Sequence, residues 1–159
     1  MSTVVGLFDD RSQAERAVNE IKESGIRKKK ISIAGKEGRL RGEGKEEEGM
    51  TGGRMATGAT TGGTIGGMAG LLAGAGALAI PGVGPILAAG PIAAGLTGVA
   101  AGGVVGGLVD MGIPRERGEH YEKELKRGSI IAAVETDGAK VEEVSSFMRN
   151  NGARDVESH

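Results

Sequence analysis

The fold of this chain is decided by two similar segments, Asp10–Gly25 (DRSQAERAVNEIKESG) and Asp137–Gly152 (DGAKVEEVSSFMRNNG). An offset of 127 residues aligns Ala14 with Val141, Ala17 with Val144, and Ile21 with Met148. This i, i+3, i+7 spacing places apolar side chains on one face of a helix. Each copy begins with an aspartate suited to an N-cap and ends with a glycine suited to a left-handed C-cap. The repeat therefore predicts two matching amphipathic helices.

Short runs of aliphatic and β-branched residues flank both predicted helices. Thr3–Phe8 precedes the first helix, and Ser129–Val134 precedes the second. The first helix is followed by Lys30–Ala34, and the second by the shorter Arg154–Glu157, which we expect at a sheet edge. Two β-α-β units in one chain predict an α+β fold, more narrowly a ferredoxin-like sandwich.

The predicted sheet is apolar on both faces. Alternation along the strands assigns Val5, Leu7, Ile31, Ile33, Ile131 and Ala133 to one face, and Val4, Phe8, Ile130, Ala132 and Val134 to the other. The two helices of the repeat can cover one of these faces. We expect the other face to require either a partner molecule or the glycine-rich middle of the chain.

A further helix is predicted just before the third strand. Pro114 stands at its first turn and Gly128 just past its last turn, which is the usual asymmetry of helix ends. Tyr121 and Leu125 form its apolar edge. We therefore expect an extra surface helix that returns the chain to the sheet.

Composition divides the chain into four parts. Residues 1–35 hold the first β-α-β half, and residues 112–159 hold the surface helix and the second half. Residues 36–54 (KEGRLRGEGKEEEGMTGGR) contain five basic and five acidic residues, which predicts a solvated, charged linker. Residues 55–109 contain no charged residue and hold 17 of the 31 glycines. We treat residues 55–111 as a separate glycine-rich block.

Glycines in this block recur at every fourth residue, which on a helix leaves bare backbone along one face. The first run is Gly58, Gly62, Gly66, Gly70 and Gly74, and the second is Gly98, Gly102 and Gly106, flanked by Gly95, Gly103 and Gly107. The stretch 80–85 (IPGVGP) lies between them, so the pattern predicts a helical hairpin of two glycine zippers over residues 55–80 and 85–109. Each interior glycine costs a helix roughly 1 kcal/mol relative to alanine, so such helices need close packing. The glycines of the two runs are our candidate helix-packing and oligomerisation residues.

Two environments could supply this packing. Each predicted helix reaches the roughly 20 residues needed to span a bilayer, which favours membrane lipid as the partner. Against this, the turn has no polar anchor, no Trp or Tyr marks an interface, and Gly, Ala and Thr make the helices weakly hydrophobic. We therefore favour packing between copies of the chain in a homo-oligomer, keep membrane insertion as the alternative, and rank a private core within a monomer last.

Residues suited to enzymatic chemistry are scarce. The chain has no cysteine, and its two histidines, His120 and His159, lack the spacing of a metal-binding or catalytic pair. Asp9 and Asp10 precede the first helix and are better suited to capping it, and no phosphate-loop motif occurs. We expect no catalytic, cofactor-binding or metal-ligating residue, no small-molecule substrate and no enzyme activity.

Charge gives little indication of a partner. The 20 basic and 21 acidic residues leave a net charge of −1, so no global field favours nucleic acid. The basic run Arg27–Lys30 could contact phosphate or lipid headgroups, but without aromatic neighbours it is typical of the solvated start of a strand. The stretch MSTVVGLFDD lacks the basic and apolar regions of a signal peptide. We expect a cytoplasmic protein, membrane-associated if the hairpin inserts.

Several of these features together resemble a known family. They are the strand-helix-strand unit with its D-x-x-x-A-x-x-A helix, the glycine-zipper insertion, and the residues Gly112, Ile113, Pro114, Tyr121, Gly128, Gly152, Ala153, Asp155 and Val156. The chain resembles bacterial general stress proteins of the heat-induced, YflT-like type. The resemblance implies a stress-induced accessory protein without assigned catalytic residues. Together with the zippers, it leads us to expect a non-enzymatic stress-response protein that self-assembles.

Overall fold

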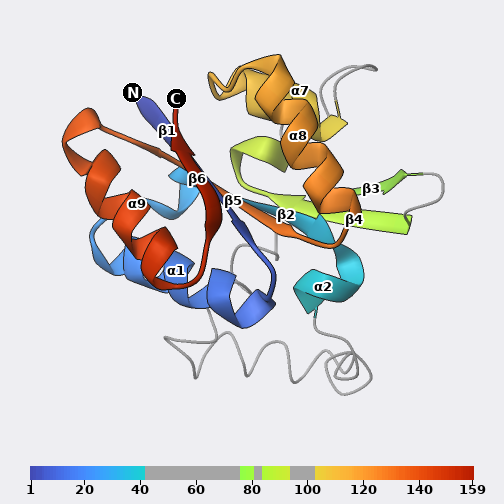
Figure 1. Ribbon diagram of the computed structural model, residues 1–159, viewed down its shortest axis with the longest axis horizontal. Helices are drawn as coiled ribbons and strands as arrows, with labels where there is room; N and C mark the ends of the chain where they lie inside the picture. Colours follow the sequence, from blue (N-terminus) through green and yellow to red (C-terminus); the bar gives the residue numbers. More distant parts are fainter. Residues whose placement is uncertain (42–75, 81–83, 94–102) are drawn as a thin grey trace.

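The centre of the structure is a six-stranded antiparallel sheet with the strand order β3-β4-β2-β5-β1-β6 (Figure 1). The computed structural model describes residues 1–41, 76–80, 84–93 and 103–159. The strands are β1 (Ser2–Phe8), β2 (Ile31–Lys36), β3 (Gly76–Ile80), β4 (Gly84–Ala89), β5 (Ile130–Thr136) and β6 (Arg154–Ser158). Helices packed on an antiparallel sheet confirm the predicted α+β class. β6 lies at a sheet edge, as expected.

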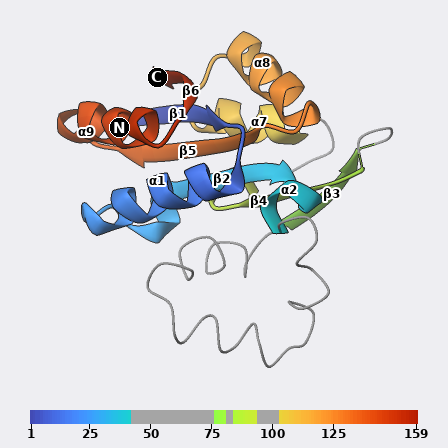
Figure 2. The same cartoon turned by 60° about the horizontal axis from the view of Figure 1, so that its bottom comes forward.

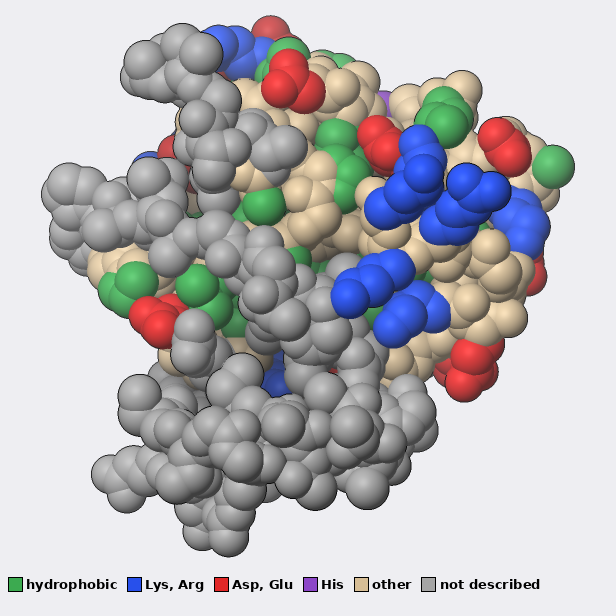
Figure 3. All heavy atoms as spheres, turned by 180° about the vertical axis from the view of Figure 1, so that it is seen from behind, with side chains coloured by type: hydrophobic (Ala, Val, Ile, Leu, Met, Phe, Trp, Pro, Cys, Tyr) green, Lys and Arg blue, Asp and Glu red, His purple; other side chains and the backbone are tan. Residues whose placement is uncertain are grey.

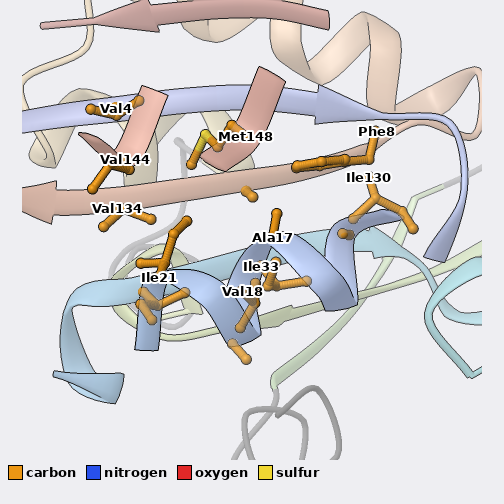
Figure 4. Close-up of a cluster of buried hydrophobic side chains, with 14 of the residues drawn as sticks. Val4, Phe8, Ala17, Val18, Ile21, Ile33, Ile130, Val134, Val144 and Met148 are labelled. Carbon is orange, nitrogen blue, oxygen red and sulfur yellow. The ribbon is translucent and has the colours of Figure 1, made fainter. Parts of the chain in front are cut away.

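The two helices of the sequence repeat pack against one face of the sheet. They are α1 (Arg11–Glu23) and α9 (Val141–Asn150). Their inward side chains join residues of the strands in one apolar cluster (Figure 4). The fully buried helix residues include Ala14, Ala17, Ile21, Val144 and Met148. Gly25 and Gly152 follow the two helices with φ of +91° and +92°, which confirms both predicted left-handed C-caps.

The helix N-termini match the repeat only in part. α1 begins directly after Asp10, whose carboxylate accepts a hydrogen bond from the Ser12 hydroxyl. This hydrogen bond holds the pKa of Asp10 below its usual range. Asp137 is followed by the 3₁₀ turn η2 (Gly138–Lys140), so α9 begins three residues later than the repeat predicts.

The opposite face of the sheet is covered by α7 (Gly103–Asp110) and α8 (Arg115–Lys126), which lie against each other in Figure 1 and Figure 2. Tyr121 and Leu125 of α8 are fully buried, in a second apolar cluster that includes Leu7 and Ile131. The extra helix is therefore present at the surface, and its predicted apolar edge packs on this second cluster. α7 comes from the glycine-rich block, so this part of the block does cover the second face.

The face assignment of β2 differs from the prediction. Ile31 pairs with Val134 and Ile33 pairs with Ala132, and all four side chains lie in the cluster beneath α1 and α9. Paired residues of antiparallel strands share a face, so the register with β5 decides which way β2 points. Alternation within each strand cannot supply that register, and the predicted grouping of Ile31 and Ile33 with Val5 is wrong.

Part of the predicted helical hairpin is a β-hairpin. β3 and β4 pair with each other, and β4 pairs with β2 from Ile33–Ala89 to Lys36–Ile86. The zipper helices predicted over residues 55–80 and 85–109 are therefore wrong at 76–80 and 84–89. A short apolar run suits a buried strand as well as a buried helix, and the edge of β2 offers it backbone partners. Residues 103–110 are helical, as predicted.

The first six residues of the predicted charged linker, 36–41, belong to a strand and a helix. Lys36 ends β2, and Glu37–Arg41 form the short helix α2. Leu40 holds this helix to the core because its side chain is fully buried. A Cβ built on Gly35 would lie 3.2 Å from Leu40 Cγ, so the two residues are in close contact. The remainder of the predicted linker, residues 42–54, lies outside the described residues.

Leu125 allows the role of α8 to be tested. We predict that Leu125→Ala lowers the free energy of unfolding by about 2–5 kcal/mol, because it removes a fully buried side chain. Lys123→Ala, on the same helix but exposed, should change that free energy by less than about 0.5 kcal/mol. Urea denaturation followed by circular dichroism measures both. Small and equal effects would show that the buried edge of α8 contributes little to the stability of the core.

Candidate functional site

Most of the glycines predicted to pack helices lie outside the described residues, namely Gly58, Gly62, Gly66, Gly70, Gly74, Gly98 and Gly102. Gly106 lies in α7, where a Cβ placed on it would meet no neighbouring atom within 4 Å. No described residue therefore packs against the side-chain position of Gly106. Its role in packing between helices stays a prediction.

Two other glycines do permit close packing around α7. A Cβ on Gly107 would lie 2.8 Å from the carbonyl oxygen of Ile92, and one on Gly118 would lie 3.3 Å from Val105 Cγ1. Bare backbone at these positions lets α7 fit between the segment after β4 and helix α8. Gly107 flanks the predicted zipper, whereas Gly118 stands alone in a charged helix and no sequence pattern indicated it. Small-residue packing thus occurs here between elements of a single chain.

A polar seam joins α8 to the end of the chain; it consists of Arg117, His120, Tyr121, Asp155, Glu157 and His159. Arg117 Nε donates to Glu157 Oε2 at 2.8 Å, and Nη2 of the same guanidinium pairs with Oε1. The Arg117 guanidinium carbon lies 5.3 Å from the centroid of the Tyr121 ring, and the Tyr121 hydroxyl donates to Glu157 Oε2 at 3.3 Å. A bidentate pair between arginine and carboxylate is geometrically specific. The polar seam therefore fixes α8 against β6.

Both histidines of the chain face carboxylates of the polar seam. His120 Nε2 lies 3.1 Å from Asp155 Oδ2, and His159 Nε2 lies 3.2 Å from Glu157 Oε2. The second contact lacks hydrogen-bond geometry, so its attraction depends on a protonated imidazole. His120 thus has a hydrogen-bond partner in Asp155. The bidentate pair of Arg117 with Glu157 and the contact of His120 with Asp155 both link α8 to β6.

The two edges of the sheet are chemically different. β6 contains Arg154, Asp155 and Glu157, and its register with β1 shifts between Val5 and Leu7. Charges and bulges are common devices that protect an edge strand from pairing with another chain. β3 (GALAI) contains no charged residue, and no strand within the described ranges pairs with its outer edge. The β3 edge is therefore the candidate surface for association.

The remaining charged residues singled out in the sequence lie in solvent or in ion pairs. Arg27 is exposed beside η1 (Lys28–Lys30), and Lys30 pairs with Glu135 at 3.1 Å. Figure 3 shows basic side chains gathered on one side of the face seen from behind. Asp9 accepts two hydrogen bonds from Arg154, at 3.0 and 2.6 Å. This pairing raises the pKa of the Arg154 guanidinium and ties β6 to the residue before α1.

The described ranges hold no group of metal-binding side chains and no helix that could cross a membrane. Over residues 1–41, 76–80, 84–93 and 103–159, no three acidic or histidine side chains form a group that could hold a metal ion. In that same part of the chain, none of the helices combines the length and the apolar character needed to cross a bilayer.

The single tyrosine provides a test of the polar seam by pH. Burial raises the pKa of Tyr121 from 10.0 to about 12. Because the folded state holds the phenol proton more tightly, this stabilisation is complete below pH 10 and is lost as the pH rises to about 12. We predict that tyrosinate absorbance appears near pH 12 in the folded protein and near pH 10 in urea.

Tyr121→Phe is the matched variant, because it keeps the buried ring and removes the titrating hydroxyl. Its free energy of unfolding should fall less steeply than that of the wild type over the same alkaline range. A wild-type protein that titrates near pH 10 in both folded and unfolded states would contradict the buried position of Tyr121.

Comparison with known proteins gave no match to a family model, to a curated protein or to a solved structure. The resemblance to general stress proteins therefore stays a prediction. Function rests on the residues themselves and on their arrangement in the fold.

Proposed function

We propose that this chain is a non-enzymatic accessory protein of the stress response that self-associates through its β3 edge and glycine-rich block. The observation that carries the proposal is the contrast between the charged edge at β6 and the uncharged edge at β3. An edge strand without charge leaves backbone donors and acceptors that a second chain can satisfy. The uncharged block on either side of β3 removes the charge repulsion that would oppose such a contact.

A second copy of the chain is the partner that suits this edge. Two antiparallel strands related by a two-fold axis are self-complementary, so the same surface serves both copies. β3 already pairs antiparallel with β4, and its outer edge can pair with β3 of another copy in the same manner. The sheets of the two copies then become continuous. No like charges meet along Gly76–Ile80 in this arrangement.

We also propose that the fold is ferredoxin-like. The order β2-β5-β1-β6, with α1 and α9 on one face, supports a ferredoxin-like repeat to which β4 and β3 are added. Because residues 76–80 and 84–89 are strands, we keep the glycine-zipper proposal only for the runs Gly58–Gly74 and Gly98–Gly106. Insertion of these runs into membrane lipid is the alternative function.

Light scattering coupled to gel filtration, without detergent, tests the proposal on the full chain. We predict oligomers that shrink on dilution. Ala79→Lys should shift them toward monomer, because it places a charge on the β3 edge opposite the exposed Pro85. Ser158→Lys adds the same charge to the already charged β6 edge and should leave the size unchanged.

A second pair of variants tests the zipper in the same experiment. Gly66→Leu/Gly70→Leu fills the proposed groove, and overpacking of roughly 1–3 kcal/mol per site should give smaller or irregular particles. Ile65→Leu/Leu72→Ile, away from that groove, should behave as the wild type. A wild-type chain that is monomeric at every concentration rejects self-association, and one that stays soluble only in detergent favours membrane insertion. If Gly66→Leu/Gly70→Leu gives smaller oligomers and Ala79→Lys does not, the contact between copies lies in the glycine runs and not at the β3 edge.

A further inference from the structure

An open pocket lies where the end of β2, the helix α2 and the turn between α8 and β5 meet. Its volume is about 270 Å³. Among its lining side chains Lys36, Arg39 and Arg127 are cationic, and Glu37 is acidic. These residues come from three separate elements, and Pro85 at the start of β4 adds an apolar wall. The lining is therefore positive overall.

The core of the protein fixes the backbone at two of these cations, Lys36 and Arg39. Lys36 is paired with Ile86 in the sheet. Arg39 precedes the buried residue Leu40 in the sequence. A Cβ built on Gly128 would lie 3.2 Å from Arg39 Nε and 3.3 Å from Arg39 Nη2. Gly128 has a φ of +105°, so glycine supplies both the turn and the bare surface on which the guanidinium rests. The pocket thus presents a positioned arginine.

The pocket's cations are only partly neutralised by the protein. Arg127 Nη1 lies 2.9 Å from Glu124 Oε1, and the Arg127 side chain is still 74% exposed. Neither Lys36 nor Arg39 forms an ion pair with another residue of the described ranges. Like charges that converge on one pocket repel each other, and a bound anion relieves that repulsion.

The geometry points to this pocket as a binding site for a small phosphate-type oxyanion. A guanidinium can bind two phosphate oxygens at once, and a lysine ammonium adds a point charge. The volume of about 270 Å³ falls below the roughly 300–1,000 Å³ of pockets that enclose drug-sized ligands. The ligand is therefore inorganic phosphate, pyrophosphate, or a phosphate group whose remaining part extends into solvent. This site is independent of self-association.

Isothermal titration calorimetry of the full chain with pyrophosphate tests the site. Arg39→Gln should raise Kd by about tenfold or more, because it removes a charged two-pronged donor. Arg39→Lys keeps the charge and should raise Kd by less. The matched control Lys29→Gln removes an exposed cation from η1 and should leave Kd unchanged.

Amide chemical shifts of the wild-type protein locate the ligand without any substitution. Pyrophosphate should shift the Gly38 and Gly128 amides most strongly. Absence of binding to the wild type, an equal loss of affinity in Lys29→Gln, or shifts centred on Lys28–Lys30 would each overturn the proposal. If Arg39→Gln fails to fold, the wild-type shifts still decide.

Vesicles of phosphatidic acid in phosphatidylcholine distinguish the source of the phosphate group. Co-sedimentation that Arg39→Gln abolishes would assign the site to a lipid headgroup. Pyrophosphate binding at Gly38 and Gly128 without co-sedimentation would assign it to a soluble phosphate. Both results support recognition of phosphate by Arg39.

Discussion

The central strand β5 is buried from both sides, and the rest of the structure depends on that double burial. Ile130 and Val134 face α1 and α9, whereas Ile131 and Ala133 face the layer formed by α7 and α8. Each apolar Å² removed from water contributes about 25 cal/mol, so a sheet that is apolar on both faces is stable only when both are covered. The chain covers them with its own helices. Both apolar clusters are therefore covered by elements of the same chain, and the proposed self-association uses other surfaces.

The second layer determines where those other surfaces lie. α7 approaches the segment after β4 closely because Gly107 has no side chain, and the polar seam fixes α8 against β6 through Arg117 and Glu157. Because β6 carries charged residues, we propose that the sheet is extended at its opposite end. The β-hairpin of β3 and β4 lies at that end, and it is built from the uncharged block. This difference between the two edges is what supports the proposed association through β3.

Local periodicity made the helices predictable, whereas non-local pairing made the strands of the block unpredictable. The spacing of Ala14, Ala17 and Ile21 predicted α1, because a buried helix face repeats within a few residues. The sequence of Gly76–Ile80 has no period that separates a strand from a helix. Its strand conformation follows from pairing with β4, which in turn pairs with the edge of β2. The pocket was equally hidden, since Arg39 and Arg127 are distant in sequence and meet only in the folded chain. Of the candidate packing glycines, only Gly106 lies among the described residues.

Amide hydrogen exchange on the full chain, at a dilute and at a concentrated condition, tests the central claim most directly. A core completed by the chain's own helices predicts slow exchange in β5 and α8 at both concentrations. The outward amides of β3 should become protected only in the concentrated sample, where a second copy can pair with them. Protection of β5 and α8 that appears only on concentration would show that a partner completes the core, and would contradict the account.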